Sequence, residues 1–514
     1  MIALLILVLS SLFSSGFVAT YALKFEFRGV LRVAIIFGLG VFLHGIEGLV
    51  IGLLDSHEGL VASLFIVTHL LVFLSLIFSK RIRFNIVLSL HEKIALMLWP
   101  VFVASVMFMA HISFEMPKDL FDGPYVFKNH NLHVRIQTIN GHLPGDNYIP
   151  FVASEFMLRD LSFKDNRPMV PGQEVVNRTF LMPLVGNVFR AAVNMPPKHV
   201  GRLDTFEYVS TQWPNVVKFG IDENYRQFLV VGVILNSLLY LLFLVLMKRF
   251  GGSKILLIGA TLFLLNPYFI SQTMFIWPKN LAAFYIGLGA ILISEKKNLI
   301  LAGFFLGLAY NSHPLAILFA VPFTLFLIQK QQVAKFLVTF IVMLLPWKIW
   351  TELILNIDSD LVAQNLFADL SIVEFIWIRL HNTYQLLMPT FFGSPRLELS
   401  KLFEHHLISA PFVIGLFYFF FAVVWLYKNK TLNQFWVLTF AVFPLILMVG
   451  VHSKPAVTAL HGFQAIYPFL YTVGLVTLRK EVNSIIFSSV FLFQLLFFLI
   501  VLFQQYQFLM NISN

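Results

Sequence analysis

The chain has 514 residues, of which 58% are hydrophobic and 12% are charged, and its mean hydropathy is +0.82. These values exclude a soluble globular enzyme and are typical of a polytopic membrane protein. The sequence contains no cysteine, which excludes disulfides, thiolate catalysis and cysteine-ligated metals. The formal charge of +10 does not indicate a nucleic-acid partner, because most lysines and arginines outside one large loop lie in short connections between apolar runs.

Apolar runs recur along the chain from its first residue, each followed by a short polar patch. Runs of roughly 17 to 24 residues match a bilayer core about 30 Å thick, and they predict an all-α polytopic membrane protein with about 14 transmembrane helices. The first run, 1–23, lacks a basic start and a cleavage site, so we expect a retained helix with its N-terminus outside. Residues 1–90 are predicted to hold three helices, and residues 407–514 the C-terminal helices.

Lysine and arginine are concentrated in alternate connections. The basic connections contain Lys24, Arg28 and Arg32; Lys80, Arg81 and Arg83; Lys248, Arg249 and Lys254; Lys296 and Lys297; Lys330 and Lys335; Lys428 and Lys430; and Arg479 and Lys480. The connections at 55–59, 310–314 and 452–462 are poor in both residues, and the positive-inside rule places them outside. This pattern predicts a bacterial inner-membrane protein with both termini outside. A large loop at 112–223 and a second loop at 351–406 would then face the periplasm, where nucleotide sugars are absent.

The large loop follows the fourth span, at about 91–111, and is where we expect the chemistry, because a bilayer protein has no packing reason to carry so long a polar segment. Residues 147–163 have apolar side chains at helical spacing and predict a short amphipathic helix lying along the membrane surface. The turns DGP, LPGDN and MVPGQE fix the backbone between such helices. The loop is therefore predicted to form an interfacial platform of amphipathic helices.

The order of these features resembles the GT-C superfamily of membrane glycosyltransferases: a helix, a long outer loop that begins with an acidic residue, then further spans. The segments 266–292 and 301–322 are also similar to that superfamily, and the resemblance covers roughly 91–350. It implies transfer of a sugar from a polyprenyl-phosphate donor to a glycan, lipid or protein acceptor, with inversion. Within that superfamily, the chain most resembles membrane arabinofuranosyltransferases. The three spans at 1–90 depart from the pattern of members that begin with the loop-bearing helix.

In that superfamily a carboxylate early in the outer loop is essential, and the matching residue here is Asp122, with Asp119 as the nearby competitor. An acceptor hydroxyl has a high pKa, so a carboxylate must take its proton during attack, and Asp122 is the predicted base. The alternative is that Asp122 caps its Gly-Pro turn. Asp146 and Asn147 lie in a turn and are candidates for contact with sugar hydroxyls.

The same loop offers further candidates for sugar or acceptor binding, which can equally form a lattice of ion pairs that holds the loop together. They are Glu155, Arg159, Glu174 and Arg178.

Cations on the outer side are needed to neutralise the donor phosphate as its bond to the sugar breaks. Lys279, beside Trp277 at a predicted outer helix end, is the sharpest candidate, and the alternative is a snorkelling lysine beside an interfacial anchor. His313 lies at another outer helix end, where a structural hydrogen bond is the alternative role. Further candidates form two outer groups: Arg379, His381, Arg396, Lys401, His405 and His406 in the second loop, and Lys454 with His461.

Adjacent histidines on a helix point about 100° apart, so His405 and His406 do not make a metal site alone. No cofactor is predicted with certainty, and a divalent metal near Asp122 is left open.

Three other classes compete with this prediction. A transporter would also have many spans, but its charges would lie in mid-membrane, whereas the predicted spans here are largely free of charge. An O-antigen ligase or polymerase would share the lipid-linked donor but place its main loop late in the chain. A structural protein would not need paired acidic and basic outer loops.

Overall fold

The protein is described from a computed structural model, which covers residues 2–79, 87–109, 136–138, 141–143, 149–160, 163, 179–195, 221–295, 298–329, 332–355, 370–387, 420–425, 427–428, 434–437, 439–440 and 463–512. Within these ranges the chain is helical except for one short hairpin, in which β1 (Ile136–Thr138) pairs antiparallel with β2 (Gly141–Leu143). Six of the helices are long and apolar enough to cross a membrane. This confirms a helical membrane protein, while the number of about 14 spans stays a prediction.

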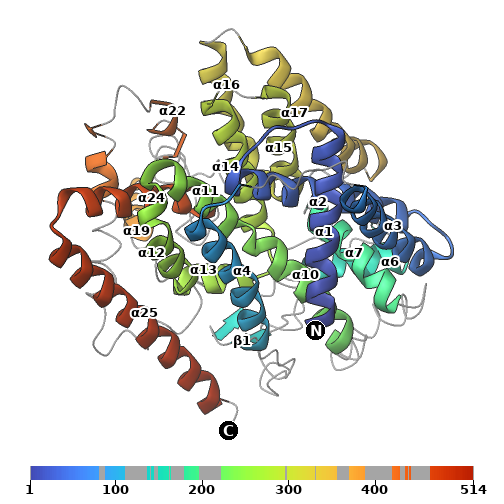
Figure 1. The fold of residues 1–514 in the computed structure, drawn as a ribbon, viewed down its shortest axis with the longest axis horizontal. Helices are drawn as coiled ribbons and strands as arrows, with labels where there is room; N and C mark the ends of the chain where they lie inside the picture. The colour runs from blue at the N-terminus through green and yellow to red at the C-terminus, as the bar shows by residue number, and fades with distance from the viewer. Residues whose placement is uncertain are drawn as a thin grey trace.

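The first four helices are α1 (Ile2–Ala22), α2 (Gly29–Gly52), α3 (Glu58–Phe78) and α4 (Leu90–Met109). Of these, α1, α2 and α3 pack against one another, and α4 lies beside the central helices (Figure 1). Glycines let α1 and α2 approach closely, because a Cβ on Gly40 would lie 2.0 Å from the carbonyl oxygen of Leu12. The start of α4 is fixed by Ser89 and Glu92, whose side chains each accept a hydrogen bond from the other residue's backbone N–H, at 2.8 Å and 3.3 Å.

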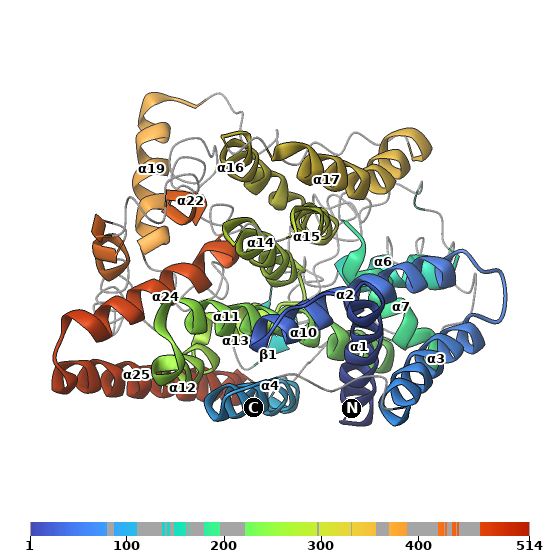
Figure 2. The ribbon, with the colours of Figure 1, turned by 45° about the horizontal axis from the view of Figure 1, so that its top comes forward.

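Two short helices from the large loop pack onto this group. They are α6 (Ile149–Leu158) and α7 (Leu181–Asn194), which lie beside α2 and α3 in both views (Figure 2). The backbone of α7 rests directly on α2, since a Cβ on Gly48 would lie 1.8 Å from the carbonyl oxygen of Leu184. The part of the large loop that forms α7 therefore packs directly against the helical bundle.

The centre of the molecule is the best-buried part. It comprises α10 (Ile221–Ser237), α11 (Leu239–Gly251), α12 (Ser253–Leu264), α13 (Pro267–Met274), α14 (Lys279–Ser294) and α15 (Leu299–Ser312). Helices α10 and α11 form one continuous apolar run, Tyr225–Gly251, whose most apolar 18-residue stretch is entirely buried in the protein. A helix surrounded by protein in this way needs no polar face along that stretch.

The remaining helices surround this centre. They are the 3₁₀ turn η3 (Pro314–Ala316), α16 (Ile317–Ile328), α17 (Val333–Lys348), the π-helix η4 (Ile349–Ile354), α19 (Ile372–Leu387), α22 (Gln434–Val437), α24 (Phe463–Glu481) and α25 (Ser484–Ile512). The long helix α25 and helix α19 lie on the side of the molecule opposite α3, α6 and α7 in both views (Figures 1 and 2).

Residues assigned to the inner side by their charge pattern come together at one end of the bundle. Arg249 pairs with Glu295 at 2.5 Å, and Lys248 lies 3.6 Å from Glu92. These contacts join α11 to the end of α14 and to the start of α4, as expected if all three chain segments lie at the same membrane face. Lys279, at the other end of α14, is then at the opposite face.

Candidate functional site

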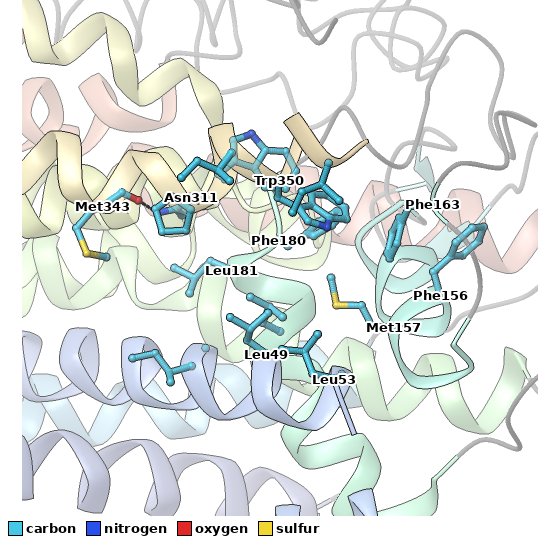
Figure 3. A pocket seen from close by; sticks show the side chains of 18 of the residues that line it. Leu49, Leu53, Phe156, Met157, Phe163, Phe180, Leu181, Asn311, Met343 and Trp350 are labelled. Carbon is cyan, nitrogen blue, oxygen red and sulfur yellow. Dashed lines mark hydrogen bonds between the residues drawn. The ribbon is translucent and has the colours of Figure 1, made fainter. Parts of the chain in front are cut away.

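A large apolar pocket lies at the predicted outer end of the bundle. Its volume is about 600 Å³, and its walls come from α2, α6, α7, α15, α17 and η4 (Figure 3). Nearly all of the lining is hydrophobic; the polar side chains in it are Asp160 and Asn311. Asn311 is held in the wall because its amide nitrogen donates to the carbonyl oxygens of Gly307 at 3.1 Å and Met343 at 2.8 Å. The pocket has the size and lining of a binding site for an apolar ligand.

Aromatic rings form one wall of this pocket. Phe180 lies between Trp347 and Trp350, with ring centroids 4.9 Å away in each case, and Phe163 is 5.2 Å from both Phe180 and Trp350. Trp350 belongs to η4, a π-helix that begins at Ile349, directly after the last residue of α17, Lys348. Short π-helical turns are rare and frequent at functional sites, because the extra residue re-aims side chains. Here it brings a second tryptophan to the same pocket.

The rim of the pocket is apolar and exposed. Ile46 and Leu49 on α2 are 46% and 48% exposed, and Ile349 and Ile354 on η4 are 44% and 54% exposed. A rim of this kind would be costly in water but not beside lipid, because lipid chains are as apolar as these side chains. The pocket is therefore suited to receive a ligand sideways from the bilayer.

A second, much smaller crevice of about 10 Å³ is lined by His313 and Trp277, and Lys279 lies next to it behind the Trp277 ring. The Lys279 Nζ lies 5.0 Å from the ring centroid of Trp277, and the Trp277 ring lies 6.2 Å from that of His313. Lys279 is only 7% exposed although it occupies the first residue of α14, where the helix dipole disfavours a cation. A buried lysine at the first residue of a helix is unusual, because neither burial nor the helix dipole favours its charge. The structure thus brings Lys279 and His313 to one place through a shared tryptophan.

Other polar groups in this crevice are fixed by the backbone. His313 Nδ1 accepts a hydrogen bond from the Leu315 N–H at 3.2 Å, which is the helix-end role foreseen as its alternative. Asn236 donates to the carbonyl oxygens of Phe275 and Trp277, at 2.9 Å and 3.2 Å, and so holds the turn before α14. Asn280 follows Lys279, is 1% exposed, and within the described part of the chain neither atom of its amide has a hydrogen-bond partner. A buried amide without partners is unusual and marks this helix end as a candidate binding element.

The crevice and the pocket share their walls. Helix α6 gives Ala153 to the crevice and Met157 to the pocket, and α15 ends with Asn311 in the pocket and His313 in the crevice. The start of α7 contributes in the same way. One helical turn or less therefore separates the apolar pocket from the crevice.

Glu155, a predicted sugar or acceptor residue, is buried beneath these walls in an ion cluster. Its carboxylate accepts from Arg159 Nε at 2.6 Å and from Arg190 Nη2, and Arg190 Nη1 also donates to Ser154 Oγ at 2.7 Å. Ser154 Oγ in turn donates to Asn187 Oδ1 at 2.6 Å. These contacts join α6 to α7, which is the lattice role considered for Glu155 and Arg159. The sequence reading missed Arg190, although an arginine on an otherwise amphipathic helix beside a carboxylate-bearing one is a detectable signal.

The predicted helix at 147–163 forms, as α6, but it is buried in the protein and has no exposed polar face. Every residue from Ile149 to Leu158 is buried except the half-buried Met157, because α7 covers the polar face and satisfies Ser154 and Glu155. Helix α7 is the amphipathic one. The expectation of an amphipathic helix with a free polar face at 147–163 was wrong, because the sequence does not show that α7 supplies the hydrogen bonds of that face.

The remaining predicted site residues are not part of this arrangement. Arg379 lies on α19, on the other side of the molecule, with its guanidinium 4.4 Å from the Phe375 ring; partial burial lowers its pKa. His381 lies on the same helix. The others lie outside the described residues: Asp119, Asp122, Asp146, Asn147, Glu174, Arg178, Arg396, Lys401, His405, His406, Lys454 and His461. Their roles stay predictions.

One premise of the sequence reading needs correction. The predicted spans were taken to be largely free of charge, but α2 and α3 bring His44, Glu47 and His69 into contact inside the helical bundle. An ionisable residue within a span is a functional candidate by default, so these three residues could have been singled out from the sequence.

Comparison with known proteins does not assign the chain: no protein family, no curated protein and no solved structure matches it.

Proposed function

We propose that the protein is a membrane glycosyltransferase that moves a sugar from a polyprenyl-phosphate donor to an acceptor at the outer face of the membrane. The observation that carries the proposal is the pocket of about 600 Å³, lined by aromatic and aliphatic side chains and rimmed by exposed apolar residues. A polyprenyl chain is apolar and reaches its enzyme through the bilayer. It would fill this pocket from the side, between α2 and η4, against Trp350.

The polar end of such a donor would lie beside the crevice, at the start of α14, where the side chains must move apart because the crevice itself holds only about 10 Å³. A phosphate at that helix end would meet the buried Lys279 ammonium, the N-terminus of α14 and the Asn280 amide. Charge-assisted hydrogen bonds in such a site stabilise the negative charge that grows on the phosphate as the glycosidic bond breaks. Lys279 would bind the phosphate, and Trp277 would hold the lysine in position through its ring face.

The finer features of the proposal come from the sequence. They are a GT-C-like arrangement with about 14 spans, a periplasmic site in a bacterial inner membrane, and Asp122 as the base that takes the acceptor proton. The buried pairing of Glu155 with Arg159 and Arg190 gives this residue a supporting role, since it holds α6 against α7 and so keeps the walls of pocket and crevice together.

A purified, liposome-reconstituted chain tests the proposal when polyprenyl-phosphate sugars and nucleotide sugars are offered side by side. Transfer from the lipid donors alone is expected. Trp350→Ala should raise the apparent KM for the lipid donor, whereas Trp377→Ala, a 61% exposed tryptophan on α19, should not. Transfer from nucleotide sugars, or equal effects of the two tryptophan substitutions, would contradict a lipid-filled pocket.

Substitution of Lys279 provides an independent test of the proposal. Lys279→Gln should weaken donor use about tenfold or more and leave the acceptor KM nearly unchanged, because a charge-assisted contact to a buried phosphate is worth about 1.5–3 kcal/mol. Lys335→Gln, an exposed lysine on α17, is the matched control. If Lys279→Gln uses the donor as well as the wild type does, the donor phosphate does not bind at Lys279.

A transporter is the second candidate, and the contact of His44, Glu47 and His69 inside the bundle favours it, since transporters use ionisable groups at membrane depth. Uptake of a solute by sealed vesicles without any transfer of sugar would establish it. An O-antigen ligase or polymerase would use the same lipid pocket, and the acceptor specificity of the transfer assay separates it from the proposed enzyme.

A further inference from the structure

Three nitrogen and oxygen ligands meet where α2, α3 and α1 pack together. His44 and Glu47 lie one turn apart on α2, with His44 Nδ1 2.5 Å from Glu47 Oε2, and His69 on α3 contacts the other carboxylate oxygen through Nε2. One ligand atom from each residue lies within 4.8 Å of the other two. His44 is 0% exposed, Glu47 is 8% exposed and His69 is half-buried. The cluster is separate from the pocket and the crevice.

Hydrogen bonds from α1 orient the His44 ring. Its Nε2 lies 3.0 Å from Ser11 Oγ and 3.4 Å from Ser15 Oγ. The Ser15 hydroxyl donates to the Ser11 carbonyl oxygen at 2.8 Å, so its oxygen is an acceptor for the imidazole. Nδ1 faces Glu47 Oε2 at 2.5 Å, so a metal ion bound there would replace the proton that the ring nitrogen and the carboxylate share. The serine hydroxyls at Nε2 are the kind of outer-shell partners that orient a metal-binding histidine.

From these contacts we propose that His44, Glu47 and His69 bind one Zn²⁺ ion. Two imidazoles and a carboxylate are a ligand set that zinc uses when a fourth position is left for water or another ligand. Mg²⁺ and Ca²⁺ are disfavoured, because they require mostly oxygen ligands and only one carboxylate is present. A divalent cation also neutralises the Glu47 charge, which would otherwise be costly among apolar helices.

The site connects α1, α2 and α3 at the place where α7 packs against α2 and α3. The His44 ring lies 5.3 Å from the Phe189 ring of α7, and a Cβ on Gly59, at the start of α3, would lie 3.0 Å from the carbonyl oxygen of Ala191. Zinc bound between α2 and α3 would hold their relative position under α7. The inference does not depend on the transferase proposal, because it concerns binding and stability and not activity.

The test uses the full-length chain, purified through a tag without histidines, stripped with a chelator and dialysed against micromolar Zn²⁺. One zinc ion per chain is expected by elemental analysis, with a rise in the unfolding temperature as zinc is added. Glu47→Gln and His69→Gln should each abolish both effects. His57→Asn, an exposed histidine in the α2–α3 connection, should retain both. Asparagine is chosen there because residue 57 has a φ of 65°.

Two results would overturn the proposal. The first is a wild-type chain that retains no zinc after dialysis. The second is Glu47→Gln and His69→Gln variants that bind zinc as the wild type does, since the ion would then sit on others of the 15 histidines. If Glu47→Gln fails to fold, His69→Gln decides, because its side chain is partly exposed and its loss leaves the contact of His44 with Glu47 in place.

Discussion

The buried carboxylate of Glu155 provides the sharpest test of how the loop is held on the bundle. One carboxylate serves two guanidinium groups, and the side chains of Glu155, Arg159 and Arg190 are 3%, 6% and 0% exposed. Glu155→Gln keeps the size of the side chain but removes the negative charge. Two buried cations are then left without their common counter-charge. Breaking a buried ion pair from one side costs about 3–5 kcal/mol, far more than a neutral hydrogen bond.

A matched substitution isolates the effect of burial. Glu352 on η4 pairs with Lys348 at 2.5 Å with the same four-residue spacing as Glu155 and Arg159, but its side chain is 53% exposed. Glu352→Gln should cost at most about 1 kcal/mol, because water and salt screen an exposed pair. Both glutamate variants would be purified in the same detergent, and their unfolding followed by the fluorescence of the eight tryptophans.

The expected difference is large enough to measure. Glu155→Gln should unfold at a clearly lower temperature and lose α7 first, seen as increased proteolysis between α6 and α7, whereas Glu352→Gln should follow the wild type. Equal stabilities of the two variants would refute the reasoning, because the Glu155 charge would then not be needed by the two arginines. Salt provides a further check: raising it should change the stability of the exposed pair more than that of the buried one.

Further outcomes are expected from other parts of the chain. Gly48→Ala should destabilise the protein by about 1–3 kcal/mol, because its Cβ would lie 1.8 Å from the Leu184 carbonyl oxygen, while Gly52→Ala, with its nearest neighbour at 3.6 Å, should be tolerated in the same unfolding assay. In the cysteine-free chain, a membrane-impermeant maleimide should label Asp160→Cys but not Lys254→Cys in intact cells, and the reverse pattern would invert the proposed topology. Asp122→Asn should leave the chain folded and reduce sugar transfer about a hundredfold or more, and near wild-type transfer would exclude it as the base.

Some residues of the candidate site could be predicted from the sequence, and others could not. Lys279 and His313 were found because both follow apolar runs at the ends predicted to be outer, and a cation at such an end is conspicuous. The pocket was not found. Its lining residues, such as Leu49, Phe180 and Trp350, are ordinary apolar residues of helices and loops, and only the packing of distant segments leaves a space between them.

The sequence by itself was sufficient to predict a helical chain with apolar, membrane-spanning segments, and six candidate spans agree with it. This was possible because apolar length is a property of consecutive residues and needs no knowledge of their partners. Only the tertiary structure decided that α7 rests on α2 at Gly48 and that Arg190 shares the carboxylate of Glu155. It also decided that His69 meets His44 and Glu47. These contacts join residues more than twenty positions apart, and they depend on shape and hydrogen-bond geometry that no local pattern encodes.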